Sequence, residues 1–400
     1  MRAARAALVG AACAASIGLG DARAADAPPD PGFTWATETT APRPAVTTPA
    51  GSLDAELLAR CGAADEGLQS AARRLAQRKA AGQPTPDVDG IVFAMRTAGQ
   101  PHVWPRAWIV SAERFEREAT KRTMESWRRS LGEPVGERRC GVATARAVVD
   151  GREVGQVIVA LAVDALADMA PLPIRARTGQ WLELDARLKV GASTAKVVLV
   201  GPGGAPRTVP TSFQEGRVRA RFALDRPGPF TVQVLADVAT GPRPVLEAQV
   251  FADVEPPRAM PSVSAPGEDA GDGKAGADAL VEMVQAVRRE RNLPALTRDP
   301  RLDRLALAHA RRMKEERMVG HDVGDGDPGQ RVQAAGLSAK EAGENVAHAE
   351  SIRLAHRSLW QSPSHRANLE RPGFTHVGAA VVEDPDGTVW VCEIFATALR

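Results

Sequence analysis

Two short polar stretches decide the fold of the last third of this chain: Gly343-Glu344-Asn345-Val346-Ala347 and Ser362-Pro363-Ser364-His365-Arg366-Ala367-Asn368-Leu369. They lie among segments with helical periodicity, one of which begins at Asp299-Pro300, an N-cap followed by proline at the first helical position. The chain then ends as strand, turn and strand over residues 377–395. A helical front and an antiparallel back predict an α+β sandwich over residues 277–400.

Several further pieces in the same order carry a family likeness. On them residues 277–400 resemble the CAP superfamily (cysteine-rich secretory, antigen 5 and pathogenesis-related, or SCP-like, proteins) in its short bacterial form. The resemblance implies a three-layer α-β-α fold with a polar cleft on one side. The matching pieces besides the two stretches are Arg291–Leu296, Ala308–Met313, His321, Trp360, Phe374–Gly378 and Trp390.

The resemblance also implies which residues line the cleft. In many members two His and two Glu converge there and can hold zinc; His321 matches the first His and Glu344 the first Glu. The second His is His365 in the bacterial pattern and His376 in the longer pattern. The second Glu has no counterpart, since the stretch after the motif tryptophan reads Gln361-Ser362-Pro363. We therefore take all four residues as cleft candidates, and His321, Glu344 and His365 as the candidate zinc ligands.

Two imidazoles and one carboxylate with an open position for water form a known zinc arrangement. The three side chains are far apart along the chain, so only the fold could bring them together. The alternative is a hydrogen-bonded polar cluster that shapes the cleft. His309 falls on the apolar face of its helix and is expected to be a core histidine with a hydrogen-bond partner. The acidic loop 322–327 is expected to be solvated, because it lacks the spaced ligands of a calcium loop.

Three functions fit these residues. The first is an exported, non-catalytic binding module whose ligand, by the resemblance, is a small molecule, a lipid or a cell-envelope partner. The second is a zinc-dependent hydrolase, in which His321 and His365 would hold zinc and Glu344 would orient or deprotonate the bound water. The third is a structural envelope protein with a vestigial cleft. The missing second Glu and the lack of a recognisable oxyanion donor favour the first.

The N-terminus predicts export to the periplasm or the cell exterior. Residues 1–24 read as a signal peptide, with early arginines, an Ala-rich apolar core and the cleavage pattern Ala22-Arg23-Ala24. Residues 25–52, rich in Pro, Thr and Ala, are expected to be a disordered tether. No segment is long and apolar enough to predict a transmembrane helix. A net charge of +2 without a Lys/Arg run gives no support for nucleic-acid binding.

Three further regions lie between the tether and the C-terminal domain. Residues 53–170 predict an α+β domain in which Cys61 and Cys140 could form a disulfide. The sequence of its final strands is similar to that of the strands at the C-terminus, which suggests that this domain is a degenerate CAP copy. The alternative is an unrelated domain. Residues 171–255 show short alternating runs and predict an antiparallel β-sandwich that resembles immunoglobulin-like modules. Residues 256–276 have the composition of a linker.

Overall fold

The computed structural model describes residues 32–44, 49, 51–149, 151–261 and 264–399. The predicted signal peptide, residues 1–24, lies outside the described residues. The chain divides into two compact units, which we treat separately. The first contains residues up to 190 with 211–230 and 245–261; the second contains residues 191–210, 231–244 and those from 262 onward.

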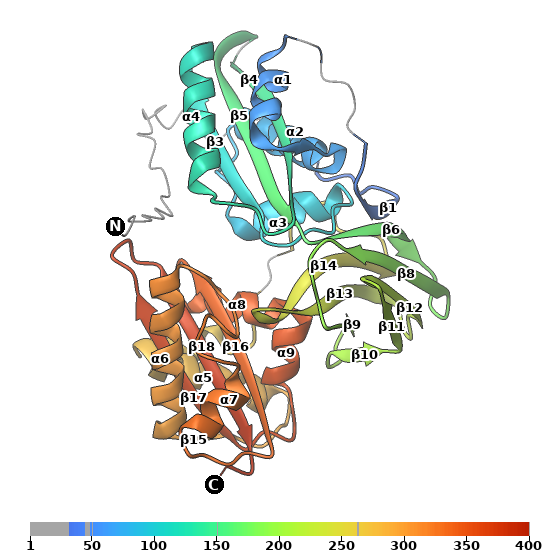
Figure 1. The fold of residues 1–400 in the computed structure, drawn as a ribbon. Coiled ribbons are helices and arrows are strands. Elements are labelled where there is room, and N and C mark those ends of the chain that lie inside the picture. Colours follow the sequence, from blue (N-terminus) through green and yellow to red (C-terminus); the bar gives the residue numbers. More distant parts are fainter. Residues whose placement is uncertain (1–31, 45–48, 50, 150, 262–263, 400) are drawn as a thin grey trace. The chain divides into compact units, whose positions relative to one another are not determined.

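The C-terminal domain is built on a four-stranded sheet of order β15-β17-β18-β16 (Figure 1). β15 runs parallel to β17, and the other pairs are antiparallel. Its elements are, in chain order, the 3-10 turn η1 (Glu268–Gly271), α5 (Gly276–Glu290), β15 (Thr297–Arg298), α6 (Pro300–Glu316), α7 (Pro328–Ala334), β16 (Glu341–Ala349), α8 (Ile352–Gln361), α9 (Pro363–Leu369), β17 (His376–Glu383) and β18 (Val389–Thr397).

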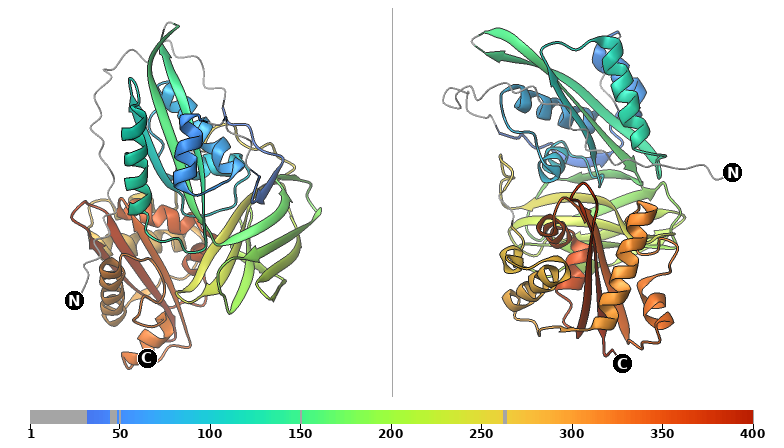
Figure 2. Two further views of the ribbon diagram at one scale, coloured as in Figure 1. Left: turned by 45° about the horizontal axis from the view of Figure 1, so that its top comes forward. Right: turned by 90° about the vertical axis from the view of Figure 1, so that its left-hand side faces the viewer.

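Helices cover both faces of this sheet (Figure 2). Even-numbered strand residues such as Val346 and Ile394 pack against α6 and α7, whereas odd-numbered residues such as Ala347 and Val391 pack against α5, α8 and α9. The alternation follows from the two-residue period of a strand, which sends successive side chains to opposite faces. The domain is therefore the three-layer α-β-α sandwich that the resemblance implied.

The first domain has a similar order of elements, with the single helix α4 where the C-terminal domain has α8 and α9. Its sheet is β2-β4-β5-β3, again with a short parallel edge strand and antiparallel pairs for the rest. Helices α2 and α3 pack on one face of this sheet, and α1 and α4 pack on the other. The elements are α1 (Leu53–Cys61), β2 (Ala63–Ala64), α2 (Glu66–Ala80), α3 (Val88–Thr97), β3 (Arg106–Ala112), α4 (Arg117–Ser130), β4 (Glu137–Val149) and β5 (Arg152–Ala165).

One junction is the same in detail in the two domains. Asp299 caps α6 and its N–H donates to Val377 O, while Asp65 caps α2 and its N–H donates to Cys140 O. The glycine that follows each acceptor lies against the third residue of the helix. A Cβ on Gly378 would come 2.3 Å from the Leu302 backbone, and one on Gly141 would come 2.1 Å from the Leu68 backbone.

The same junction is completed by one side chain on each helix. The Asp303 carboxylate accepts from the N–H of Ala379 at 2.8 Å, and the Gln69 amide oxygen accepts from the N–H of Val142 at 3.0 Å. Each of these residues is the fourth of its helix, and each donor directly follows the close-packed glycine. Four matched contacts at one junction support a common architecture for the two domains.

The disulfide that the sequence left open is present: Cys61 and Cys140 are bonded, whereas Cys392 is a buried free thiol. The bond joins the end of α1 to β4 across 79 positions of sequence. In the chain-entropy model, a closed loop of this length destabilises the unfolded state by about 4.5 kcal/mol.

The middle region forms two five-stranded sheets, β1-β6-β8-β12-β11 and β10-β9-β13-β14-β7. Alternating burial along β8 and β12 is typical of strands with one covered face. The likeness to immunoglobulin modules stays a prediction. The strands are β1 (Glu38–Ala41), β6 (Ala167–Pro173), β7 (Arg175–Ala176), β8 (Trp181–Leu188), β9 (Thr194–Val200), β10 (Arg207–Val209), β11 (Thr211–Gln214), β12 (Arg217–Ala223), β13 (Gly228–Val238) and β14 (Gly241–Ala252).

Two segments predicted to be unstructured have defined contacts instead. Within the predicted tether, Phe33 and Trp35 are buried and β1 pairs with β6. Within the predicted linker, the Glu268 carboxylate is buried and pairs with Arg357 of α8. Both segments are short on apolar residues, so composition alone suggested disorder. A few well-placed aromatic and charged side chains are enough to fix them.

Candidate functional site

Glu344 is the centre of the candidate site. It lies in the middle of β16, faces α6 and α7, and its side chain has no exposed surface. His321 Nδ1 donates to its Oε1 at 2.9 Å, and Cys392 Sγ donates to its Oε2 at 3.4 Å. Burial alone would raise the pKa of this carboxyl, but the His321 hydrogen bond and the nearby His321, His309 and Arg331 charges outweigh it and lower the pKa. Glu344 is therefore an ionised carboxylate inside the protein.

Arg331 supplies the main countercharge. It lies on α7, is buried, and donates from Nη2 to Glu344 Oε2. Its Nη1 donates to the carbonyl oxygens of His321, at 2.8 Å, and of Gly326. The guanidinium thus holds both the carboxylate and the loop that carries His321. Asp327 fixes the start of α7 through a capping box with Gln330, which places Arg331 one turn further on.

His309 completes the buried cluster from the α6 side. Its Nδ1 lies 2.7 Å from Asp325 Oδ2 and its Nε2 lies 2.9 Å from Gly320 O; Nε2 is also 3.7 Å from Glu344 Oε1. Both ring nitrogens of His309 thus face oxygen atoms of the protein. His309 is a core histidine with hydrogen-bond partners, as predicted, and it belongs to the same cluster as Glu344. Asp325, in the loop predicted to be solvated, is one of those partners.

His321 lies at the outer edge of the cluster, with 13% of its side chain exposed. Because Nδ1 donates to Glu344, Nε2 is the ring nitrogen left for another partner. The main chain around it is also engaged: the N–H groups of His321 and Asp322 both donate to Thr240 O, at 2.9 and 3.1 Å. Thr240 belongs to the same compact unit as the C-terminal domain.

His365 lies close enough to His321 for the two rings to interact electrostatically. It is on α9, which begins at Pro363, and its residue surface is half-buried. Burial of the ring first, and the His321 charge second, lower the pKa of His365 to about 3. The ring is therefore neutral at physiological pH. His321 thus contacts Glu344 directly, whereas His365 interacts with His321 only through its charge.

His376 is not part of this cluster. It begins β17 and pairs across the sheet with Ala396, which in turn pairs with Ala342 of β16. His376 is therefore two strands away from Glu344 across the sheet and two residues away along the strand. With ordinary strand spacing, this separation corresponds to about 12 Å between their Cα atoms. Its Nδ1 lies 2.9 Å from Thr375 Oγ1 instead. The longer-pattern alternative for the second His does not fit this chain.

A second buried acid lies on the opposite face of the sheet. Asn345 Nδ2 donates to Glu393 Oε2 at 2.9 Å, and Asn368 Nδ2 donates to Asn345 Oδ1, also at 2.9 Å. Burial raises the pKa of Glu393 to about 7, against the lowering effect of the Asn345 hydrogen bond. The hydrogen bond between Asn345 and Asn368 thus joins the two polar stretches of the sequence.

The donor set does not fit a zinc ion held through Glu344. One carboxylate oxygen accepts from His321 and the other from Arg331 and Cys392, so a metal would have to displace a buried guanidinium. Across the described residues, no three His, Cys, Asp or Glu side chains are arranged so as to hold a metal ion.

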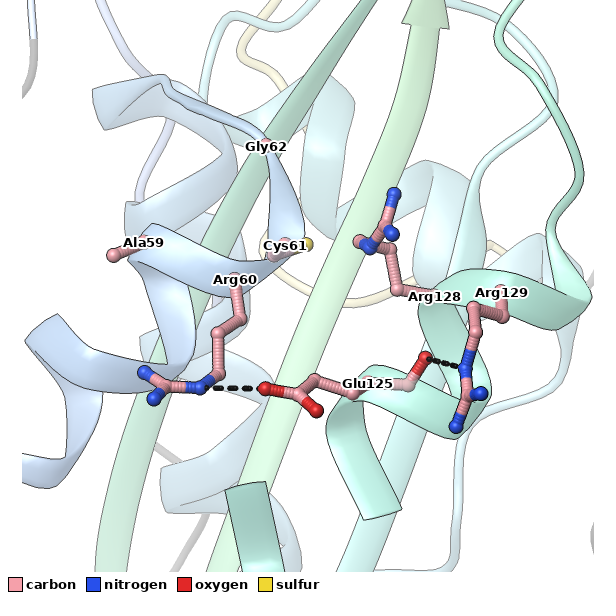
Figure 3. Close-up of a pocket in the computed structure, with 7 residues that line it drawn as sticks. All are labelled: Ala59, Arg60, Cys61, Gly62, Glu125, Arg128 and Arg129. Carbon is pink, nitrogen blue, oxygen red and sulfur yellow. Dashed lines mark hydrogen bonds and ion pairs between the residues drawn. The ribbon is translucent and has the colours of Figure 1, made fainter. Parts of the chain in front are cut away.

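Two surface hollows lie elsewhere. One of about 620 Å³ lies at the ends of α1 and α4 in the first domain, where the Arg60 and Glu125 side chains pair at 3.0 Å (Figure 3). Arg60 and Arg129 each donate to a carbonyl oxygen of their own helix, so they cap helix ends. The other, of about 230 Å³, is lined by residues of the middle region, including Arg217, which is paired with Asp185. Neither hollow is lined by a candidate site residue.

Comparison with known families agrees with this geometry. Residues 281–394 match the family model of the Cysteine-rich secretory protein family, CAP. The C-terminal domain is a CAP domain. The match covers this domain alone, so the CAP assignment says nothing about residues 32–261.

A curated relative of the CAP domain is the protein described as "Uncharacterized protein YkwD" of Bacillus subtilis (strain 168). It is 33% identical over 113 residues, which are 28% of this chain and 43% of the relative. The chain therefore spans less than half of the length of this relative.

Three solved structures are similar in part. An outer surface protein of Borrelia burgdorferi is 20% identical over 30% of this chain and 90% of its own, with a TM-score of 0.28. An extracellular protein containing an SCP domain from Bacillus anthracis str. Ames is 16% identical over 58% and 86%, with a TM-score of 0.28. A cysteine-rich secretory protein of Staphylococcus aureus is 12% identical over 59% and 81%, with a TM-score of 0.27.

Sequence reasoning missed Arg331, the residue that holds the Glu344 carboxylate. The capping pattern Asp327-Pro328 did predict its short helix. The sequence around it, Gly329-Gln330-Arg331-Val332-Gln333, reads as a polar surface turn. Only the fold shows that Arg331 faces inward beside Val332.

Proposed function

We propose that this protein is an exported binding protein whose CAP domain is non-catalytic. The observation that carries the proposal is the position of Glu344: its side chain has no exposed surface, Oε1 accepts from His321, and Oε2 accepts from Arg331 and Cys392. A general base needs an oxygen lone pair aimed at substrate or water, and a zinc ligand needs one aimed at the metal. Here the carboxylate instead acts as the anchor of a buried cluster.

The outer rim of the cluster is the part that a ligand could reach. It offers the half-buried His365 and the ring of His321, together with two exposed apolar side chains, Met318 and Val319, at 39% and 40% exposure. Exposed apolar groups beside polar ones are typical of binding surfaces. This combination favours an amphipathic ligand, for which a lipid is the first class to test, ahead of a small molecule or an envelope protein.

Export is supported by three observations. The chain carries the predicted signal peptide, the first domain has a disulfide, and two of the solved relatives are named as an extracellular and a secretory protein. In the part of the chain described, no helix has the length and apolar character to span a membrane.

We further propose that residues 53–170 are a degenerate CAP copy without the cluster. Ile394 of β18 pairs with Glu344 on one side and with Gly378 on the other. In the first domain, Leu161 of β5 pairs with Ala107 on one side and with Gly141 on the other. An alanine thus takes the place of Glu344. Counting seven residues from the matched Leu302 and Leu68, Leu75 takes the place of His309. The first domain would then serve as a scaffold.

Metal analysis and lipid binding test the proposal. The purified mature chain, incubated with micromolar zinc and desalted, is expected to retain no stoichiometric zinc. Lipid vesicles of neutral and anionic composition are expected to bind the wild type and to bind a Met318→Ser, Val319→Ser variant more weakly. Met260→Ser, which changes an exposed methionine of the other compact unit, is the control. One zinc per chain, lost in a His321→Ala, His365→Ala variant, would instead support the hydrolase.

A further inference from the structure

The turn between β13 and β14 contacts the rim of the CAP cleft through its main chain. Thr240 O accepts from the N–H groups of both His321 and Asp322, at 2.9 and 3.1 Å. Residues 231–244 belong to the same compact unit as the CAP domain. The two adjacent N–H groups of His321 and Asp322 thus form a specific binding site for the carbonyl oxygen of this turn.

The residue after Thr240 lies directly on the candidate histidine. Gly241 has φ +92°, in the left-handed region, and a Cβ at this position would lie 2.7 Å from His321 Cβ and 3.4 Å from its Cγ and Cδ2. Both the backbone angle and the close approach require glycine. The turn therefore packs against the His321 side chain as well as against its main chain.

Two further contacts hold neighbouring segments on the same rim. The Gln233 side chain, 1% exposed, accepts from the N–H of Ser364 at 3.1 Å and donates to Ser362 Oγ at 3.3 Å. Arg366 donates to Gly204 O at 2.9 Å. Ser364 and Arg366, the neighbours of His365 in the chain, are thus both hydrogen-bonded to residues outside the CAP domain.

We propose that the Thr240–Gly241 turn is the resident occupant of the CAP cleft and closes it in cis, so that access to His321 and His365 requires the turn to leave. The turn contributes no large apolar side chain, so it is held against His321 mainly by hydrogen bonds. Such contacts open locally more readily than a packed core. A ligand of the rim would then compete with a segment of the same chain. The inference concerns access alone, and its test uses no ligand, so it can fail while the proposed binding function stands.

The first experiment measures access in the intact mature chain. Histidines are modified with diethyl pyrocarbonate and quantified by mass spectrometry, and amide exchange is followed at His321 and Asp322. In the wild type, His321 should react more slowly than the half-exposed His376. Gly241→Ala should raise both the reaction rate of His321 and the amide exchange, by about tenfold for each hydrogen bond lost. Labelling of the fully buried His309 reports any unfolding of the domain.

A matched control exists in another hairpin. Gly216 follows the β11 strand with φ +76°, but the atom that a Cβ would meet first is Leu188 O at 3.8 Å, an ordinary contact. Gly216→Ala imposes similar backbone strain without touching His321, and it should leave the labelling of His321 unchanged. If wild-type His321 reacts as fast as His376, or if Gly241→Ala changes nothing, the turn does not close the cleft.

A cross-link decides the question should Gly241→Ala unfold the domain. A Cβ on Gly320 would lie 3.3 Å from Thr240 Cβ, slightly under the usual 3.5–4.5 Å range of disulfides. In the Thr240→Cys, Gly320→Cys variant, amide exchange at His321 and Asp322 should be about tenfold slower in the oxidised than in the reduced form. The labelling of His365 should slow by about the same factor. Equal rates in the oxidised and reduced forms would overturn the inference.

Discussion

Arg331 and Glu344 form an ion pair inside the CAP domain, with 7% of the arginine side chain and none of the carboxylate exposed. Around it, the ring of His309 lies 2.7 Å from Asp325 Oδ2 and 3.7 Å from Glu344 Oε1, so the ion pair is surrounded by further polar side chains. Charges removed from water in this way are stable only as a set, because each one left unpaired keeps its full desolvation penalty.

Arg331→Met is therefore expected to destabilise the CAP domain by about 3–5 kcal/mol, because it leaves the Glu344 carboxylate buried without its main countercharge. Urea unfolding followed by tryptophan fluorescence measures the change, since Trp360 and Trp390 lie in this domain. The Arg331→Met, Glu344→Leu pair should recover most of the loss. Arg312→Ala, which breaks an exposed pair with Glu316, should change stability by less than about 1 kcal/mol. A single Arg331→Met variant as stable as the wild type would disprove the ion-pair account.

Glu393 gives the CAP domain a distinct pH dependence. Its folded-state pKa is raised to about 7 from 4.5, the ordinary value for a glutamate, so the folded state binds its proton more tightly than the unfolded state does. The stability from this group is complete below pH 4.5, falls as pH rises to about 7, and is lost above that. Glu393→Gln should remove this slope and stabilise the domain at pH 8 by about 3 kcal/mol. Parallel wild-type and variant profiles between pH 5 and 8 would contradict the assignment.

The disulfide should act on the first domain alone. Cys61→Ser, Cys140→Ser is expected to lower the stability of that domain by about 4 kcal/mol, because the unfolded chain regains the freedom of a 79-residue loop. The cysteine of the CAP domain, Cys392, is free, so unfolding of that domain should not respond to reductant. Differential scanning calorimetry with and without reductant separates the two transitions. A shift of both by similar amounts would argue against independent domains.

The matched glycines should be equally intolerant of a side chain. Gly141→Ala and Gly378→Ala each place a Cβ within 2.4 Å of helix backbone, so each should destabilise its own domain by several kcal/mol, about the cost of severe overpacking. Gly373→Ala is the control, since that site has open space and an ordinary backbone angle. Chemical denaturation of each variant checks the result. A tolerated Gly141→Ala would weaken the proposed degenerate copy.

The sequence predicted the CAP fold well because its evidence is local. Helix caps such as Asp299-Pro300, the polar stretch around Glu344 and the turn before β18 each fix an element by nearby residues. The convergence of His321, Glu344 and His365 could be expected only through the family resemblance. No spacing along the chain brings these three together, and residues from a loop, a strand and a helix meet only after the sheet has formed.

The rest depended on contacts between residues far apart along the chain. Arg331 looks like a surface residue, and the segment that holds Phe33 and Trp35 looks too poor in apolar residues to fold. In the sequence, Gly241 looks like any other glycine of a hairpin. Its role is to leave space for His321, which is 80 positions later in the chain. Patterns within one element carry no information of this kind.

The glycine at position 241 also ties the CAP domain to the chain that precedes it. If residues 277–400 were produced as an isolated fragment, the amides of His321 and Asp322 would be hydrated, and the imidazole would face solvent. Such a fragment would present His321 without the turn that covers it. Affinities measured on it would exceed those of the full-length molecule, and the difference between the two would report how strongly the native polypeptide shields its own histidines.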